Sequence, residues 1–164
     1  MTKRIILIIA IIAFMFITIG ATTQSDSYNK QFIRTTYRDD TEIKTILSSK
    51  EELNAFYEKY KDTLYLEHRE KVYVDSTIGF FDAIEKYDEE YFKGNNLIII
   101  YITEPSGSIT HDIKNISIKD NTIEISISQK SSEYLTCDMA GWLLILEIEN
   151  THEIITINYT KSKN

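Results

Sequence analysis

Apolar residues recur with a helical period in the first half of the chain and with a strand period in the second half. Ser49 and Glu52 form a capping box, which predicts the start of a helix. Apolar positions three and four residues apart follow and place one stripe toward a core: Leu53, Phe56, Tyr57 and Tyr60. A second helix is predicted over residues 79–87, and then a short turn over residues 88–93 that Gly94 ends in a left-handed conformation.

The residues before the first helix predict strands, and those after it predict an irregular connection. Residues 31–38 and 41–48 (QFIRTTYR and TEIKTILS) alternate apolar and polar positions, which predicts two short strands around the turn pair Asp39-Asp40. Residues 61–76 are charged, with scattered apolar positions. They predict an irregular connection in which the tripeptide VYV is extended.

Residues 97–103 and 142–149 (LIIIYIT and WLLILEIE) are apolar at nearly every position. This pattern is typical of central strands that are covered on both faces. Residues 153–159 (EIITINY) follow the second of these strands after a polar turn. Because sequential strands joined by a short turn usually pair, residues 142–149 and 153–159 are predicted to form a hairpin.

The clearest hairpin covers residues 115–128, with Asp120-Asn121 as a two-residue loop suited to positive φ. This loop places apolar residues opposite one another in two pairs, Ile118 with Ile123 and Ile116 with Ile125. Upstream, the apolar positions change from even to odd numbers around Lys114-Asn115. A β-bulge is predicted there, because one extra residue restores the face of the strand.

These elements predict a single α+β domain over residues 31–164, preceded by a polar tether over residues 25–30. Two main helices pack against a mostly antiparallel β-sheet. The apolar residues of the second helix could line a ligand site, but core packing is the expected role for all of them: Phe80, Phe81, Ile84 and Tyr87.

The first 24 residues have the layout of an export signal. Lys3 and Arg4 precede an apolar run over residues 5–20, and Ala21 offers a small residue for cleavage. The run suits a cleaved signal peptide or an uncleaved anchor, in which residues 5–21 hold the chain in the membrane. In both cases the positive-inside rule places the rest of the chain outside the cytoplasm.

Charge and cysteine content exclude several classes of function. The formal net charge is −7, and a surface this acidic repels the phosphates of nucleic acids. The single cysteine, Cys137, excludes an intrachain disulfide and a site built on several cysteines. The three histidines show no metal-binding spacing. The sequence therefore predicts no metal and no cofactor, and His68 and His152 are expected to be solvated.

Candidate chemistry is concentrated in residues 103–111 (TEPSGSITH), which hold an acid, two hydroxyls and an imidazole: Glu104, Ser106, Ser108 and His111. Pro105 and Gly107 predict a turn over Glu104–Gly107. No G-x-S-x-G motif surrounds either serine, so the sequence favours a polar turn over a catalytic nucleophile. His111 shares the face of Ile109 and Ile113 and is expected to be a satisfied core or edge residue. A pH-sensing or ligand-binding role is the alternative.

Residues 136–142 (TCDMAGW) form the second unusual stretch. Cys137 is expected to be a small buried hydrophobic residue. Asp138 can hold the turn before strand 142–149 by bonding local backbone amides. Trp142 shares a strand face with Leu144, Leu146 and Ile148 and is therefore expected in the core. There its indole N–H needs a hydrogen-bond acceptor.

The chain resembles a group of small secreted proteins of Firmicutes that look like relatives of the PrcB C-terminal domain family, named after a subunit that stabilises an extracellular protease complex. The resemblance covers residues 31–160 and is most specific at Tyr87–Phe92, Glu104–His111 and Thr136–Trp142. Members of the family often carry histidine where this chain has Leu143. The resemblance implies a secreted domain with a protein partner, and it brings no known activity with it.

The same resemblance suggests that Glu104–His111 and Thr136–Trp142 border one sheet and meet in space. His111 is then expected to pair with Asp138 or Glu104, as a polar lock between strands or as the floor of a small binding site.

The sequence thus favours an extracytoplasmic, non-enzymatic module that binds or stabilises another secreted or envelope protein, with exposed tyrosines as candidate contacts. Two alternatives stay open. One is a binder of small ligands or peptides that uses a face of the sheet. The other is a hydrolase that uses four residues, which must converge in an open cleft: Glu104, Ser106, His111 and Asp138.

Overall fold

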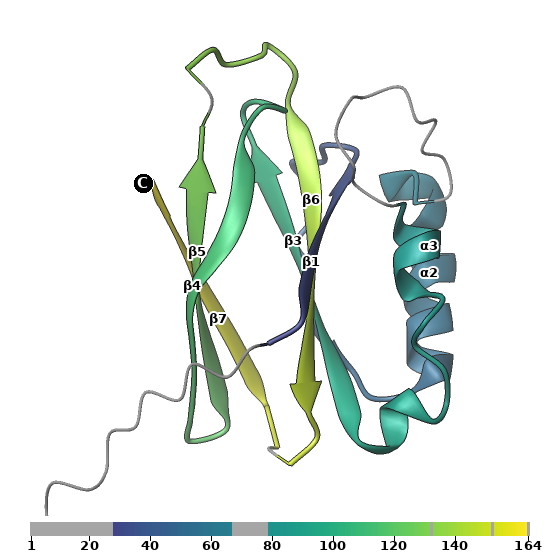
Figure 1. Cartoon of the computed structure of the whole chain (residues 1–164). Helices are drawn as coiled ribbons and strands as arrows, with labels where there is room; N and C mark the ends of the chain where they lie inside the picture. Colours follow the sequence, from purple (N-terminus) through teal and green to yellow (C-terminus); the bar gives the residue numbers. More distant parts are fainter. Residues whose placement is uncertain (1–27, 67–78, 132, 152, 164) are drawn as a thin grey trace, which may run out of the picture.

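Two β-sheets stack face to face, and helices cover the outer face of one of them, as the computed structural model shows (Figure 1). The structure describes residues 28–66, 79–131, 133–151 and 153–163. The result is an α+β fold with mostly antiparallel strands, as predicted. The expected single sheet is wrong, because the strands divide into a four-stranded and a three-stranded sheet.

The four-stranded sheet has the order β1-β6-β3-β2 and is antiparallel throughout. Its strands are β1 (Lys30–Thr35), β2 (Lys44–Leu47), β3 (Asn95–Glu104) and β6 (Ala140–Glu149). The three-stranded sheet has the order β4-β5-β7, with strands β4 (Thr110–Lys119), β5 (Thr122–Lys130) and β7 (Thr156–Lys163). The helical elements are α2 (Lys50–Leu64), α3 (Phe80–Ile84) and the short 3₁₀ helix η1 (Tyr91–Lys93).

Helix α2 begins at the predicted cap. The Glu52 backbone N–H donates to Ser49 Oγ at 3.1 Å, and the Glu52 carboxylate accepts from the Ser48 N–H at 2.6 Å. The capping box is therefore confirmed, although the carboxylate reaches one residue further back than expected. At the other end Tyr65 adopts a left-handed conformation, which ends the helix.

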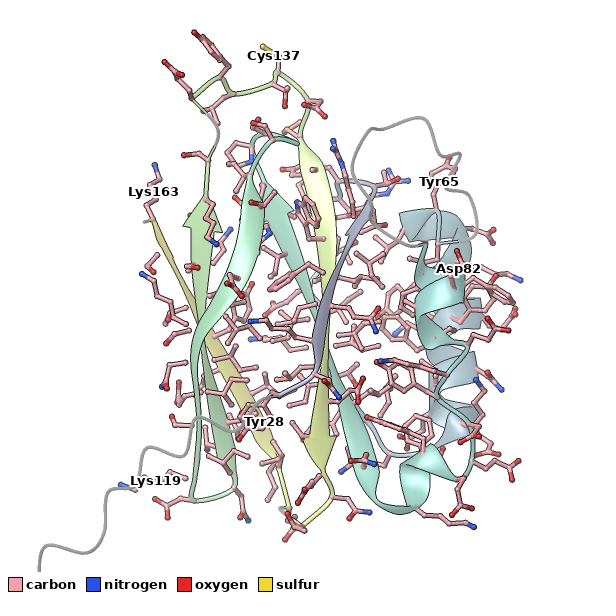
Figure 2. All side chains as sticks on the ribbon, viewed as in Figure 1. Tyr28, Tyr65, Asp82, Lys119, Cys137 and Lys163 are labelled. Atoms are coloured by element: carbon pink, nitrogen blue, oxygen red, sulfur yellow. The ribbon has the colours of Figure 1, made fainter. Side chains whose placement is uncertain are left out.

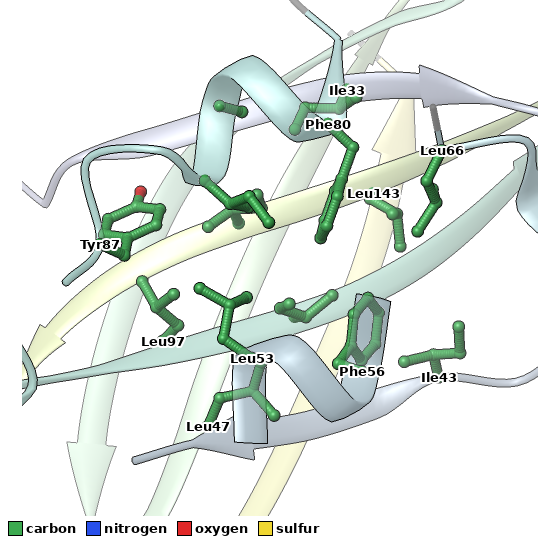
Figure 3. Packing of buried hydrophobic residues seen from close by; sticks show 14 of the residues in the cluster. Ile33, Ile43, Leu47, Leu53, Phe56, Leu66, Phe80, Tyr87, Leu97 and Leu143 are labelled. Carbon is green, nitrogen blue, oxygen red and sulfur yellow. The ribbon is translucent and has the colours of Figure 1, made fainter. Parts of the chain in front are cut away.

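The core has two parts on either side of the four-stranded sheet. One part lies between this sheet and the helices, where Leu53, Phe56, Phe80 and Tyr87 pack (Figure 3). The other lies between the two sheets. Strands β3 and β6 contribute to both parts, since alternate residues of a strand point to opposite faces. The prediction of two-sided central strands at these positions is confirmed.

The hairpin of β4 and β5 agrees with its prediction. Asp120 and Asn121 have φ angles of 48° and 61°, and the register pairs Ile118 with Ile123. The register shifts between Ile113 and Asn115, so the predicted bulge is confirmed as well.

The predicted hairpin of β6 and β7 is wrong. Strand β7 pairs with β5 instead, in parallel. The reason is that β6 has no edge left, because β1 and β3 occupy both of its sides. The chain after β6 crosses to the second sheet, where the N–H groups of Ile155 and Thr156 donate to the Asn121 carbonyl oxygen.

Strands β1 and β2 exist as predicted and flank a turn at Asp39-Asp40, yet they do not pair with each other. They form the two opposite edges of the four-stranded sheet. Alternating apolar positions reveal that a strand has a buried face, but they do not specify its neighbour.

Three local expectations also need correction. Gly94 has a φ of −119°, so it does not end η1 in a left-handed conformation. Helix α3 is shorter than predicted, and Phe81 is exposed, whereas Phe80, Ile84 and Tyr87 are buried. Phe81 lies about 100° around the helix from Phe80, on the side away from Ala83 and Ile84, and therefore points to solvent.

Some expectations fall outside the described residues. The N-terminal signal or anchor, the VYV segment, His68 and His152 belong to this group. Across the ranges that the structure describes, no helix combines the length and the hydrophobicity needed to cross a membrane.

Candidate functional site

A buried carboxylate joins the two sheets. Glu104 is the last residue of β3 and is 1% exposed. Its Oε1 lies 2.8 Å from Nε2 of His111, and Gln129 Nε2 lies 2.8 and 2.7 Å from its two oxygens. Lys161 Nζ completes the group at 3.0 Å. These four residues, from β3, β4, β5 and β7, are called the Glu104 cluster below, and they connect one strand of the first sheet to every strand of the second.

The Glu104 cluster keeps its carboxylate charged. Burial by itself raises the pKa of Glu104, but hydrogen bonds from His111, Gln129 and Lys161, with the charge of Lys161, lower it to about 2. An ionised carboxylate only accepts hydrogen bonds, so His111 Nε2 carries the proton of this contact. A charge buried this deeply is stable only when it is paired and hydrogen-bonded, as here.

The imidazole of His111 is enclosed by aromatic rings. It stacks on Phe32, with ring centroids 5.5 Å apart, and meets Trp142 edge to face at 5.4 Å. Its side chain has no exposed surface. Among the described residues, neither His111 Nδ1 nor Trp142 Nε1 has a hydrogen-bond partner. Trp142 is thus in the core, as predicted, but without the acceptor that its indole was expected to find.

A second polar group ties the start of β4 to the segment before β6. Ser106 is buried, and its Oγ lies 2.9 Å from both Ser108 Oγ and Thr136 Oγ1. The Ser108 N–H donates to Thr136 Oγ1 at 3.2 Å, and Ser108 Oγ donates to the Tyr134 carbonyl at 3.3 Å. These contacts fix residues 134–136 to the neighbouring connection.

Asp138 closes the same junction through an ion pair. Its Oδ2 lies 2.5 Å from Nη2 of Arg34, and its carbonyl accepts from the Gly107 N–H at 2.7 Å. Arg34 also donates to the Gly107 carbonyl at 3.3 Å. A hydrogen bond from Thr136 and the contact with Arg34 lower the pKa of Asp138.

Gly107 has a different role from the one expected. None of the glycines that the structure describes has a positive φ. The turn runs from Ser106 to Ile109, whose N–H donates to the Ser106 carbonyl at 3.2 Å, rather than over Glu104–Gly107. A Cβ at position 107 would instead overlap with Arg34 and Asp138. Close approach of the ion pair therefore requires the glycine here.

The candidate residues consequently divide into two neighbouring groups. Glu104, His111 and Trp142 meet between the sheets, whereas the others form the junction outside them: Ser106, Gly107, Ser108 and Asp138. Of the two partners considered for His111, Glu104 is the one it contacts. The two segments do not border a single sheet, because His111 lies in β4 of the second sheet.

The geometry does not assemble a catalytic triad. Ser106 bonds to two hydroxyl groups, and His111 Nε2 is occupied by Glu104. Asp138, the remaining acid of the hydrolase alternative, pairs with Arg34 at the surface. The groups are buried or separated rather than open to one cleft, so the arrangement lacks the serine–histidine contact that nucleophilic catalysis uses.

Four contributing polar residues were not among the candidate site residues: Arg34, Gln129, Thr136 and Lys161. Gln129 stands directly opposite His111 in the register of β4 and β5. Counting back from the Asp120-Asn121 loop through the predicted bulge would have found it. The sequence pattern did not indicate Lys161, because the predicted strand ended at residue 159 and was assigned to the wrong neighbour, whereas β7 extends to Lys163.

The segment supported by the junction exposes apolar side chains. Tyr134, Leu135 and Met139 are 79%, 59% and 57% exposed. Cys137 is exposed as well, so its prediction as a buried residue is wrong (Figure 2). Residues 133–139 are called the apolar loop below. Its backbone lies outside both sheets, which leaves the cysteine no core to enter.

A shallow depression lies elsewhere, beside helix α3, lined by Gln31, Asp82, Ala83, Glu85 and Lys86. None of the candidate residues borders it. Within the described ranges, no group of three or more His, Cys, Asp or Glu side chains is arranged to hold a metal ion.

Comparison with known proteins found no match to this chain among protein-family models, curated proteins or solved structures.

Proposed function

We propose that the chain is an extracytoplasmic, non-enzymatic module that binds or stabilises another secreted or envelope protein. The observation that supports this most directly is the apolar loop. It presents Tyr134, Leu135 and Met139 to solvent. Exposed apolar side chains close together on a surface usually mark an interaction site.

Hydrogen bonds and an ion pair also fix the apolar loop to the neighbouring connection. Thr136 and Asp138, which lie between its exposed residues, are bonded to Ser106 and Arg34. A contact surface that is already ordered loses less entropy on binding than a disordered one. The polar residues of the candidate site therefore order the apolar loop and do not catalyse a reaction.

The position of the loop suits a partner on the far side from the N-terminus. Cys137 lies at one end of the molecule, whereas Tyr28, where the chain continues toward its N-terminal segment, lies toward the other (Figure 2).

The test is capture of the partner from the envelope fraction of the producing organism by chemical cross-linking. The double variant Tyr134→Ser/Leu135→Ser is compared with Ile155→Ser, which removes an equally exposed apolar side chain elsewhere. The proposal predicts that the double variant loses the cross-linked partner at an unchanged melting temperature, whereas Ile155→Ser retains it. Capture of the same partner at the same yield by the double variant would refute the proposal.

A further inference from the structure

The two sheets do not match in width. Strand β1 lies across from β4, since Phe32 stacks on His111 and Lys30 pairs with Asp112 at 2.5 Å. Strand β3 lies across from β7, because Lys161 Nζ contacts the Thr103 carbonyl at 2.9 Å. Strand β2, the last strand of the wider sheet, therefore lies beyond the strand positions of the narrower sheet, and among the described residues the side chain of Tyr159 in β7 approaches Lys44 of β2.

The inner surface at this position is incompletely covered. Ile46 of β2 pairs with Ile98 and faces the space between the sheets, yet it is only half-buried, whereas Ile98 is fully buried. On the opposite side, Ile157 and Tyr159 of β7 are also half-buried, although their register partners in β5 are fully buried. A strand added beside β7 would cover all three side chains.

The edges of the sheets differ in how they are protected. Edge strands commonly avoid pairing with other chains by being short, bulged or covered. Strand β2 has four residues, β4 carries the bulge after Ile113, and β1 and β4 cover each other through side-chain contacts. Strand β7 has eight residues, no proline and an uninterrupted register with β5; its protection is limited to two lysines near its end, of which Lys161 is bound by Glu104.

The outer edge of β7 therefore offers a row of backbone groups for a new strand. Among the described residues, β7 forms strand pairs only with β5. Two adjacent residues of a strand direct their N–H and C=O groups to opposite sides. Every second residue of β7 thus directs its N–H and C=O groups away from β5, where a further strand can bind them.

We propose that β7 accepts an extended segment of a partner protein as the fourth strand of the second sheet. The proposal rests on the proposed function as a protein-binding module and gives it a second contact. Inward-facing residues of the added strand are apolar next to Ile157 and Tyr159. Farther along, the same face of β7 ends in the exposed Lys163, so a carboxylate of the added strand fits there.

The first test uses a capped eight-residue peptide that alternates valine and threonine, with glutamate in place of the last valine. Hydrogen exchange of the ¹⁵N-labelled protein is followed by NMR as the peptide is added. The proposal predicts that exchange slows at least tenfold at alternate amides of β7. A peptide of the same composition with a central proline is the control and should have no effect, because proline interrupts the ladder.

Two protein variants localise the binding. Ile46→Lys places a charge in the uncovered space without altering β7, and it should weaken peptide binding at least tenfold. Thr160→Lys is the matched control, since Thr160 points to the outer face of the sheet, and its affinity should stay within twofold.

Three results would overturn the proposal: no change in β7 exchange at millimolar peptide, equal affinity of Ile46→Lys, or protection of β7 by concentration-dependent dimerisation without peptide. The last would assign the edge to a second copy of the chain. The Tyr134→Ser/Leu135→Ser variant should bind the peptide normally. Loss of partner capture and loss of strand addition are therefore separate outcomes.

Discussion

Nε2 of His111 and Oε1 of Glu104 lie 2.8 Å apart and join the two sheets of the fold across their shared core. Neither side chain reaches solvent: Glu104 is 1% exposed and the side chain of His111 has no exposed surface. The contact has consequences for stability, for pH dependence and for the protonation of the imidazole.

Replacing the central carboxylate is expected to be costly. Glu104→Gln removes the charge that Lys161 pairs with and leaves an amide among donors, so the free energy of unfolding should fall by about 3 kcal/mol. Urea denaturation measures this loss. Glu149→Gln, at an exposed position of β6, is the control and should change stability by less than about 0.5 kcal/mol. Equal stability of the two variants would show that the Glu104 cluster is dispensable.

The same residue predicts acid sensitivity. The pKa of Glu104 is lowered in the folded protein to about 2, from an ordinary value of 4.5, so its stabilising effect is fully present above pH 4.5. As the pH falls toward 2, the unfolded chain takes up a proton first, and up to about 3 kcal/mol of stability is lost. Urea titrations from pH 7 to pH 3 should show the wild type losing its advantage over Glu104→Gln. A constant difference between them would contradict the lowered pKa.

His111→Ala separates a structural role from a binding role. The variant leaves a cavity between Phe32 and Trp142 and removes one donor from Glu104, so unfolding should become easier by about 2–4 kcal/mol. Thermal melting measures the effect. A variant that keeps its melting temperature but loses a binding partner would instead make His111 part of a binding site.

The tautomer of His111 follows from the charge of Glu104. Because the carboxylate accepts, the proton of the contact lies on Nε2, and ¹⁵N shifts of the imidazole should place it there at neutral pH. A proton on Nδ1 alone would contradict the orientation of the ring.

Two glycines should respond differently to alanine. Gly107→Ala meets the ends of the Arg34 and Asp138 side chains, which can move aside at the cost of a surface ion pair worth about 1 kcal/mol or less. Gly141→Ala meets the backbone carbonyl of Thr36 and the Tyr101 ring, which cannot move separately. Denaturant titration should therefore rank Gly141→Ala as the more destabilised variant, by at least about 2 kcal/mol.

In Gly107→Ala, the visible change should be local. Amide exchange at Gly107 and within the apolar loop should accelerate while the global stability falls little, because the loop loses its anchor at Asp138. Unchanged exchange in the loop would mean that Thr136 alone is enough to hold it.

The sequence predicted the fold best where local chemistry decides the structure. The cap at Ser49 and the hairpin loop at Asp120-Asn121 depend on neighbouring residues only, and both are present. The pairing of β7 depends on which edge is free after the other strands have assembled. A repeating pattern in one strand carries no information about that competition.

The candidate site shows the same limit. Glu104 and His111 are seven residues apart, and their residue types suggested a polar contact. Lys161 lies 57 residues away from Glu104 and reaches it only through the parallel pairing of β7. The burial of Cys137 was predicted from residue type alone, and it failed because the segment around it extends beyond both sheets.

The distance along the chain between Glu104 and Lys161 also sets an order of events during synthesis. A ribosome completes β3, β4, β5 and β6 before it adds the lysine that neutralises the carboxylate. Until then, closing the two sheets over Glu104 would bury a charge held only by His111 and Gln129. Closure of the two sheets is therefore expected to follow the synthesis of β7 rather than to precede it.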